Sequence, residues 1–141
     1  MLVNEIMNRN VVVVKKDATI KEASEVMSKL DISSLVVVEG DKIVGILTNT
    51  DIVRSVAQNK QPESTLVEEM MTSKVITIEP DKKIEDAVDL MLENKIRELP
   101  VVENNKIKGI ITVTDIAVAE PKLIASIASL LALQLPGYPG G

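Results

Sequence analysis

The chain has 141 residues and a mass of 15.3 kDa, with 45% apolar and 26% charged residues, which is an ordinary globular composition. It contains no His, Cys, Trp or Phe, which excludes imidazole bases, His or Cys metal ligands, cysteine nucleophiles and disulfides. The net charge is −5 and neither half of the chain is basic, which argues against binding to nucleic acid or to an anionic membrane.

Targeting and membrane segments are not expected from the sequence. The first residues have no basic start followed by an apolar run, so they do not read as a signal peptide. The longest apolar segment, residues 123–135, has 13 residues and is too short to span a bilayer. We therefore expect a cytoplasmic protein that does not associate with membranes.

The chain contains an internal repeat. When the sequence is shifted by 64 residues, residues 7–52 align with residues 71–116 without a gap, and 19 of the 46 aligned pairs are identical. Such self-similarity indicates a tandem duplication. It divides the chain into a first repeat (1–60), a second repeat (61–120), and a C-terminal segment (121–141) predicted to be a helix and a flexible tail.

Each repeat begins with a predicted strand and a predicted helix. The strand is a β-branched run, at residues 11–14 and again at 75–78. Thr19 and Glu22 have the spacing of a capping box, which predicts a helix start. Apolar residues then recur on one helical face. They are Ile20, Ala23, Met27 and Leu30 in the first copy, and Ile84, Ala87, Val88 and Met91 in the second.

A predicted hairpin and a second helix complete the repeat. Two apolar strands flank a two-residue turn, Gly40-Asp41 in the first copy and Asn104-Asn105 in the second, and both turns supply residues that tolerate positive φ. The second helix is expected to begin near Thr50 or Asp51, and near the matching residues of the other copy. The unit is therefore β-α-β-β-α, and the fold class is α/β (α+β).

A seven-residue motif links the last strand of each repeat to the helix that follows. Residues 45–51 read Gly-Ile-Leu-Thr-Asn-Thr-Asp, and residues 109–115 read Gly-Ile-Ile-Thr-Val-Thr-Asp. Free N–H groups at a helix start attract anions, Thr hydroxyls suit phosphate oxygens, and an Asp carboxylate accepts ribose hydroxyls. The same Thr-x-x-Asp spacing is also that of an N-cap with an acid in the first turn. The motif predicts either a nucleotide site or a helix cap.

Taken together, these features resemble the cystathionine β-synthase (CBS) domain family. The resemblance rests on the element order, the spacing Asp-x-x-Ile-x-x-Ala-x-x-x-Met, the run Ile-Arg-Glu-Leu-Pro-Val-Val at 96–102, and the seven-residue motif. It covers roughly residues 5–120 and has the form of a tandem pair, often called a Bateman module. It implies two CBS repeats related by pseudo-two-fold symmetry, followed by an apolar C-terminal helix.

The resemblance also implies a ligand and the residues that bind it. CBS pairs typically bind adenosine-containing ligands in clefts between the repeats, with the motif Asp on the ribose and the Thr hydroxyls near phosphate. Here these residues are Thr48, Thr50 and Asp51 in one site, and Thr112, Thr114 and Asp115 in the other. The opposite repeat is expected to supply the adenine side, with Val12, Ser33 and Ser34 at the Asp115 site, and Ile76 and Arg97 at the Asp51 site.

Two arginines are expected to bring positive charge to the phosphate. We expect Arg97 to serve the Asp115 site, with reach to either cleft, and Arg54 to serve the Asp51 site; alternatively, each is a solvated charge or part of an ion pair. The matching positions of the other repeat hold Ser33 and Val118. So few cations favour AMP or ADP over ATP, with S-adenosylmethionine also possible. The ligand is expected to be regulatory, with no required cofactor, no metal and no catalytic residue.

Several functions stay open at this point. The first is an adenine-nucleotide sensor that signals to an unidentified protein target, as a homodimer formed through CBS-pair helices. The alternative is a dimeric interaction module with vestigial clefts and no nucleotide ligand. Catalysis and nucleic-acid binding are disfavoured. The apolar helix predicted at 121–135 must be buried, either within the chain or between protomers.

Overall fold

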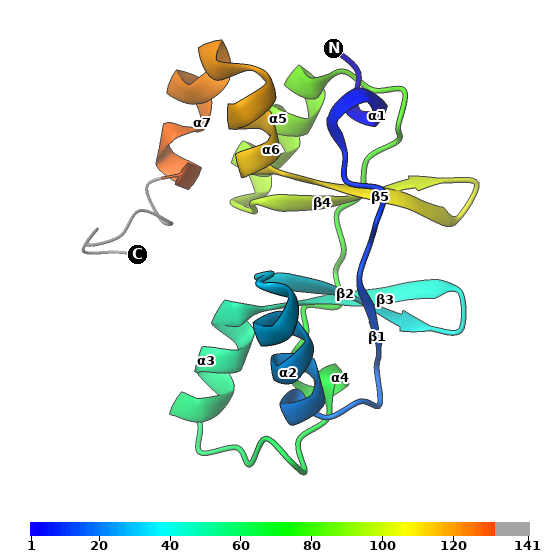
Figure 1. Cartoon of the computed structure of the whole chain (residues 1–141), viewed down its shortest axis with the longest axis vertical. Helices are drawn as coiled ribbons and strands as arrows, with labels where there is room; N and C mark the ends of the chain where they lie inside the picture. The colour runs from blue at the N-terminus through cyan, green and yellow to red at the C-terminus, as the bar shows by residue number, and fades with distance from the viewer. Residues whose placement is uncertain (132–141) are drawn as a thin grey trace. The chain divides into compact units, whose positions relative to one another are not determined.

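The computed structural model of the chain describes residues 1–131, and these residues belong to two compact units (Figure 1). The first unit consists of Val11–Val75. The second unit combines Met1–Asn10 with the described residues 76–131. Both units contain helices and strands, which confirms the predicted α+β class.

The first unit is a three-stranded sheet with helices. In chain order its elements are β1 (Val13–Lys15), α2 (Ile20–Leu30), β2 (Ser34–Glu39), β3 (Lys42–Thr48), α3 (Asn49–Ala57) and α4 (Val67–Met70). β1 pairs parallel with β2, and β2 pairs antiparallel with β3. The predicted capping box opens α2, because the Glu22 N–H donates to Thr19 Oγ1 at 3.1 Å. Both α2 and α3 lie on one face of the sheet (Figure 1).

The second unit repeats this plan with one strand fewer. Its elements are α1 (Val3–Ile6), α5 (Ile84–Asn94), β4 (Glu98–Glu103), β5 (Lys106–Thr112), α6 (Val113–Ala119), a 3-10 turn η1 (Pro121–Leu123) and α7 (Ile124–Leu131). β4 and β5 pair antiparallel, with a register shift between Val101 and Val102. The hairpin of the first unit has the same shift, between Val37 and Val38. The duplication has therefore kept the register of the hairpin.

The strand predicted at residues 75–78 is not formed as a regular strand. Ile78 makes a single parallel bridge to Val101. In the first unit the Val36 N–H donates to the Val12 carbonyl at 3.3 Å, but the matching residue of the second unit is Pro100, which has no N–H. The prediction was wrong here because proline removes one rung of the parallel ladder.

The segment that opens each repeat packs in the unit of the other repeat. The Asn8 N–H donates to the Ile110 carbonyl at 2.8 Å, and Ile110 donates back at 2.9 Å. Thr72, which matches Asn8, pairs with Ile46 in the same way, at 2.9 and 3.0 Å. The compact units are therefore offset from the sequence repeats: residues 1–10 complete the second unit, and the segment around α4 completes the first.

Each unit has a hydrophobic core on which its helices pack. On α2, Ile20, Ala23 and Met27 are buried as predicted, whereas Leu30 is 49% exposed. Leu30 is the last residue of that helix, and the next residue, Asp31, has a left-handed φ of 54° that turns the chain away. All four residues predicted on the buried face of α5 are buried: Ile84, Ala87, Val88 and Met91.

The predicted C-terminal helix packs within the chain. It begins as the 3-10 turn η1 and continues as α7, and its residues Ile127 and Leu130 are buried in the core of the second unit. The remainder of that prediction, residues 132–135 and the tail at 136–141, lies outside the described residues. Among residues 1–131, no helix is long and apolar enough to cross a membrane.

The two hairpin turns differ in detail. Asn104 and Asn105 both have positive φ, 53° and 63°. In the first hairpin Gly40 has a φ of 61°, but Asp41 is not among the residues with positive φ. The expectation of two positive-φ residues therefore holds for the second turn only.

Candidate functional site

The seven-residue motif forms a capping box at the junction of strand and helix in both units. Thr48 is the N-cap of α3, and its N–H donates to Asp51 Oδ2 at 2.8 Å. Thr112 is the N-cap of α6, and its N–H donates to Asp115 Oδ2 at 3.0 Å. The helices therefore begin at Asn49 and Val113, slightly earlier than predicted, because the Thr of the box and not its Asp is the cap.

The two motif carboxylates differ in burial and charge. Asp51 is 4% exposed, and its second oxygen, Oδ1, accepts a hydrogen bond from Arg54 Nη1 at 2.8 Å. Asp115 is only partly buried, and the position that matches Arg54 holds Val118, which is 77% exposed. Within residues 1–131, no ion pair reaches Asp115. Among the described residues, a cation therefore pairs with the motif carboxylate of the first unit but not with that of the second.

The second Thr of each motif lies on the surface. Thr50 and Thr114 are both exposed in the first turn of their helices, one residue before the motif Asp. A hydroxyl at this place lies in the first turn of its helix, where the Asp51 and Asp115 N–H groups donate to the capping Thr48 and Thr112 hydroxyls. The exposed Thr and the capping Thr thus have different roles, although sequence analysis placed both near phosphate.

The motif glycines accommodate a neighbouring backbone segment. A Cβ on Gly109 would lie 2.8 Å from the Asn8 carbonyl oxygen and 2.9 Å from Met7 Cγ. A Cβ on Gly45 would lie 3.0 Å from the Thr72 carbonyl oxygen, with the Met71 side chain closer still. The motif glycines are therefore explained by the close approach of a neighbouring backbone segment.

Two of the residues predicted for the adenine side, Ser33 and Arg97, contact the start of the motif helix in their own unit. The Ser33 carbonyl accepts from the Asn49 N–H at 2.9 Å, and the Arg97 carbonyl accepts from the Val113 N–H at 2.9 Å. These bonds tie each segment to the start of the helix that carries the motif Asp of the same unit. Val12, Ser33 and Ser34 belong to the unit of Asp51, and Ile76 and Arg97 to the unit of Asp115. The predicted pairing across repeats joins residues of different units and stays a prediction.

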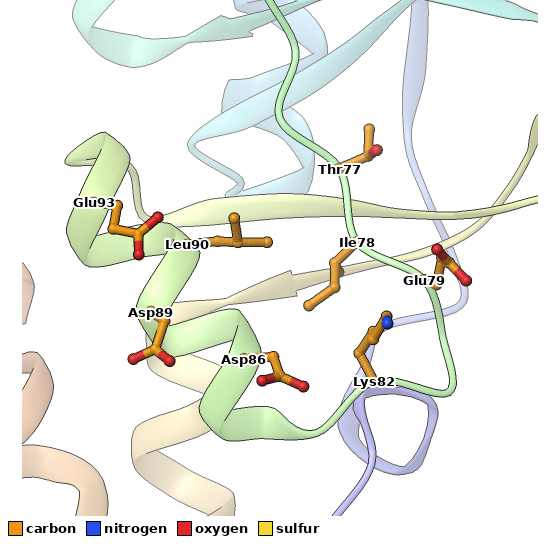
Figure 2. Close-up of a pocket in the computed structure, with 8 residues that line it drawn as sticks. All are labelled: Thr77, Ile78, Glu79, Lys82, Asp86, Asp89, Leu90 and Glu93. Atoms are coloured by element: carbon orange, nitrogen blue, oxygen red, sulfur yellow. The ribbon is translucent and has the colours of Figure 1, made fainter.

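A pocket of about 420 Å³ in the second unit was not found by sequence analysis. It lies between α5 and the segment before it, with Ile78 and Leu90 as its apolar wall (Figure 2). The other lining residues are Thr77, Glu79, Lys82, Asp86, Asp89 and Glu93. Four carboxylates against one ammonium would repel a phosphate, so this pocket does not suit a nucleotide. The sequence does contain one indication of this pocket, because Asp86, Asp89 and Glu93 are spaced so that they lie on one face of a helix.

Metal binding has no support in the described part of the chain. No group of three or more acidic side chains there could hold a metal ion. Outside the motifs, hydrogen bonding and charge from Glu39 raise the pKa of Lys16, and Lys16 in turn lowers the pKa of Glu39. The capping boxes therefore remain the candidate binding elements.

Comparison with protein families identifies the two repeats. A model of the CBS domain family matches residues 3–58 and residues 67–122. An uncharacterized protein of Methanopyrus kandleri is 38% identical over 128 residues, which are 89% of this chain and 65% of that protein. The chain thus spans slightly less than two thirds of that relative.

Solved structures share the fold over most of the chain. A CBS domain pair in complex with 5′-methylthioadenosine and S-adenosyl-L-methionine has a TM-score of 0.80 and 31% identity, covering 86% of this chain and 97% of that one. A hexameric CBS-CP12 protein from bloom-forming cyanobacteria has a TM-score of 0.77 and 30% identity, covering 89% of this chain and 74% of that one. Adenosine ligands and oligomers thus both occur among proteins similar to this chain.

Proposed function

Because this chain belongs to the CBS domain family and carries two copies of the domain, we propose that it is a regulatory protein that binds an adenine nucleotide and signals to a protein target. It has no catalytic role in this proposal. The observation that carries the proposal is the repeated Thr-x-Thr-Asp box in a chain similar to a CBS pair that holds two adenosine ligands.

The proposed contacts follow the chemistry of the motif. Asp51 and Asp115 accept ribose hydroxyls, because a carboxylate held by its own helix cap presents its oxygens in a fixed direction. Thr50 and Thr114, exposed in the first turn, place hydroxyl groups at the N-terminus of the helix, where the helix dipole favours a phosphate. Arg54 and Arg97 supply positive charge, and two arginines suit AMP or ADP better than a triphosphate.

A second candidate function is an interaction module without a nucleotide. It is favoured by the capping role of both motif Asp residues, which accounts for them without any ligand. A hexameric relative shows that proteins of this fold assemble. In this alternative the chain forms a homodimer, and its target recognises the dimer surface.

Calorimetric titration of the nucleotide-stripped full chain separates the two functions. AMP, ADP, ATP, S-adenosylmethionine and NAD are titrated in turn, and saturable binding of at least one adenine ligand is expected. Absence of binding by all five, together with a stable dimer, would establish the interaction module instead. Release of a hydrolysis product over many turnovers would contradict the non-catalytic role.

Substitution of the motif carboxylates tests the proposed contacts. Asp115→Ala is expected to weaken nucleotide binding by roughly 1–3 kcal/mol, as for a lost charged hydrogen-bond acceptor, and Asp51→Ala is the matching change in the first unit. Asp89→Ala, which removes an exposed carboxylate from α5, is the control and should leave affinity unchanged. Unchanged affinity in both motif variants would disprove the ribose assignment.

A further inference from the structure

The two proposed ribose carboxylates differ in one residue that the duplication has not kept. In the first unit Arg54 donates to Asp51 Oδ1 at 2.8 Å, while Oδ2 is held by the N–H of Thr48. In the second unit Val118 stands at the position of Arg54, and its side chain is exposed. Only one of the two carboxylates is therefore paired with a cation of its own helix.

This ion pair changes what a ligand must do to bind at Asp51. A ribose hydroxyl has to compete with a guanidinium for Oδ1, and a hydrogen bond between two ionised groups is stronger than one in which only the carboxylate is charged. When a neutral nucleoside displaces the Arg54 guanidinium from Asp51, it offers the guanidinium no new partner. A ligand with a phosphate does offer one, since guanidinium and phosphate pair in the same forked geometry. The anion therefore lowers the cost of opening the pair.

The Arg54 side chain is free to make such an exchange. Its exposed fraction is 51%, whereas that of the Asp51 side chain is 6%. The carboxylate is thus fixed by its burial and its cap, and the guanidinium is the exposed partner that a ligand can reach. Arg97 does not play the same role in the second unit, because within the described residues no ion pair joins it to Asp115.

We propose that Arg54 is a specificity-determining residue, an inference that rests on the proposed function. It makes the site at Asp51 select adenosine ligands that carry an anionic group and reject neutral nucleosides. The site at Asp115, with Val118 in place of the arginine, also binds neutral nucleosides, because no guanidinium of its own helix competes for the carboxylate. The two sites of one chain thus differ in ligand class, although their capping boxes are the same.

Adenosine and AMP are the probes, and each site is measured alone by calorimetry on the full chain. Asp115→Asn leaves the site at Asp51, and Asp51→Asn leaves the site at Asp115. In the Asp115→Asn background, AMP is expected to bind at least about tenfold more tightly than adenosine, the size of one charge-assisted contact. Adding Arg54→Val, which copies the second unit, should reduce that preference to about threefold or less by strengthening adenosine binding.

The reciprocal change is Val118→Arg in the Asp51→Asn background, which should increase the preference of this site for AMP over adenosine. Lys29→Ala, which removes an exposed cation from α2 of the same unit as Arg54, is the control for net charge and should leave the preference unchanged. Thermal unfolding of each variant shows that it is folded.

Two results would overturn the inference, and they have different consequences for the proposed function. If neither adenosine nor AMP binds the wild-type chain or any variant, the role of Arg54 is refuted, and the proposed function fails with it only if ADP, ATP, S-adenosylmethionine and NAD do not bind either. If both bind but the preference at Asp51 is unaffected by Arg54→Val, the proposed function stands and the role of Arg54 is refuted.

Discussion

The two units have the same helix cap but different surroundings. In the first unit a three-stranded sheet leads to a buried Asp51 paired with Arg54. In the second unit a two-stranded sheet leads to a partly buried Asp115, whose helix α6 contains no cationic residue that could pair with it. The second unit also has the additional helix α7, which packs in its core. The hairpin register and the cap are common to both.

This contrast distinguishes the features that position the motif carboxylate from those that would determine which ligand it binds. The shared features are backbone features: the bulge in the hairpin, the glycine that admits a neighbouring segment, and the Thr N-cap. Beside the motif carboxylates, the features that differ include exposed side chains, such as Arg54 and Val118. A duplicated unit can therefore change its ligand preference without changing the position of its carboxylate.

The largest expected effect concerns α7, which only the second unit has. Ile127 is fully buried, so Ile127→Ala should destabilise the chain by about 2–5 kcal/mol through lost burial and a residual cavity. Ile124 on the same helix is 42% exposed, so Ile124→Ala is the matched control, with an expected cost below about 1 kcal/mol. The measurement is the free energy of unfolding in urea. Equal costs would show that α7 is not part of the core.

A smaller effect is expected from the motif glycines. Gly109→Ala should cost about 1–3 kcal/mol, because its new methyl would lie 2.8 Å from the Asn8 carbonyl, a backbone atom that cannot move alone. Gly45→Ala should cost less, since the Thr72 carbonyl is 3.0 Å away and the other neighbour is a flexible Met71 side chain. Unfolding free energies of the two variants test this order. The reverse order would mean that residues 1–10 yield more easily than the segment after α4.

The sequence predicted the features that depend on residues close together in the chain. The caps at Thr19, Thr48 and Thr112 were readable because a capping box joins residues three apart. The hairpins were readable from two β-branched runs around a short turn. For the motif Thr and Asp, the residue types allowed both a cap and a nucleotide site; the structure confirms the cap, and the nucleotide site stays a prediction.

The features that sequence analysis missed depend on distant residues. The pairing of Asn8 with Ile110 joins segments about 100 residues apart in the chain, and no local periodicity carries it. The acidic pocket beside α5 likewise needs Glu79 and Glu93 to be brought together by the fold. Pro100 could have corrected the prediction of a strand at residues 75–78, because a proline cannot donate a hydrogen bond to a neighbouring parallel strand.

Pro100 provides the smallest expected effect and the most local test of the difference between the units. Pro100→Val restores an N–H at the position where Val36 donates to Val12, and should allow residues 76–78 to pair as a regular strand. The net change in stability should stay within about 1 kcal/mol, since a new hydrogen bond is offset by lost proline rigidity. Hydrogen exchange of the new amide is therefore the better measurement, and slow exchange is expected. Val36→Pro is the reciprocal variant and should shorten β1 to a single bridge. Fast exchange at residue 100 would show that proline is not what limits the second sheet, and that the path of residues 75–78 is set elsewhere.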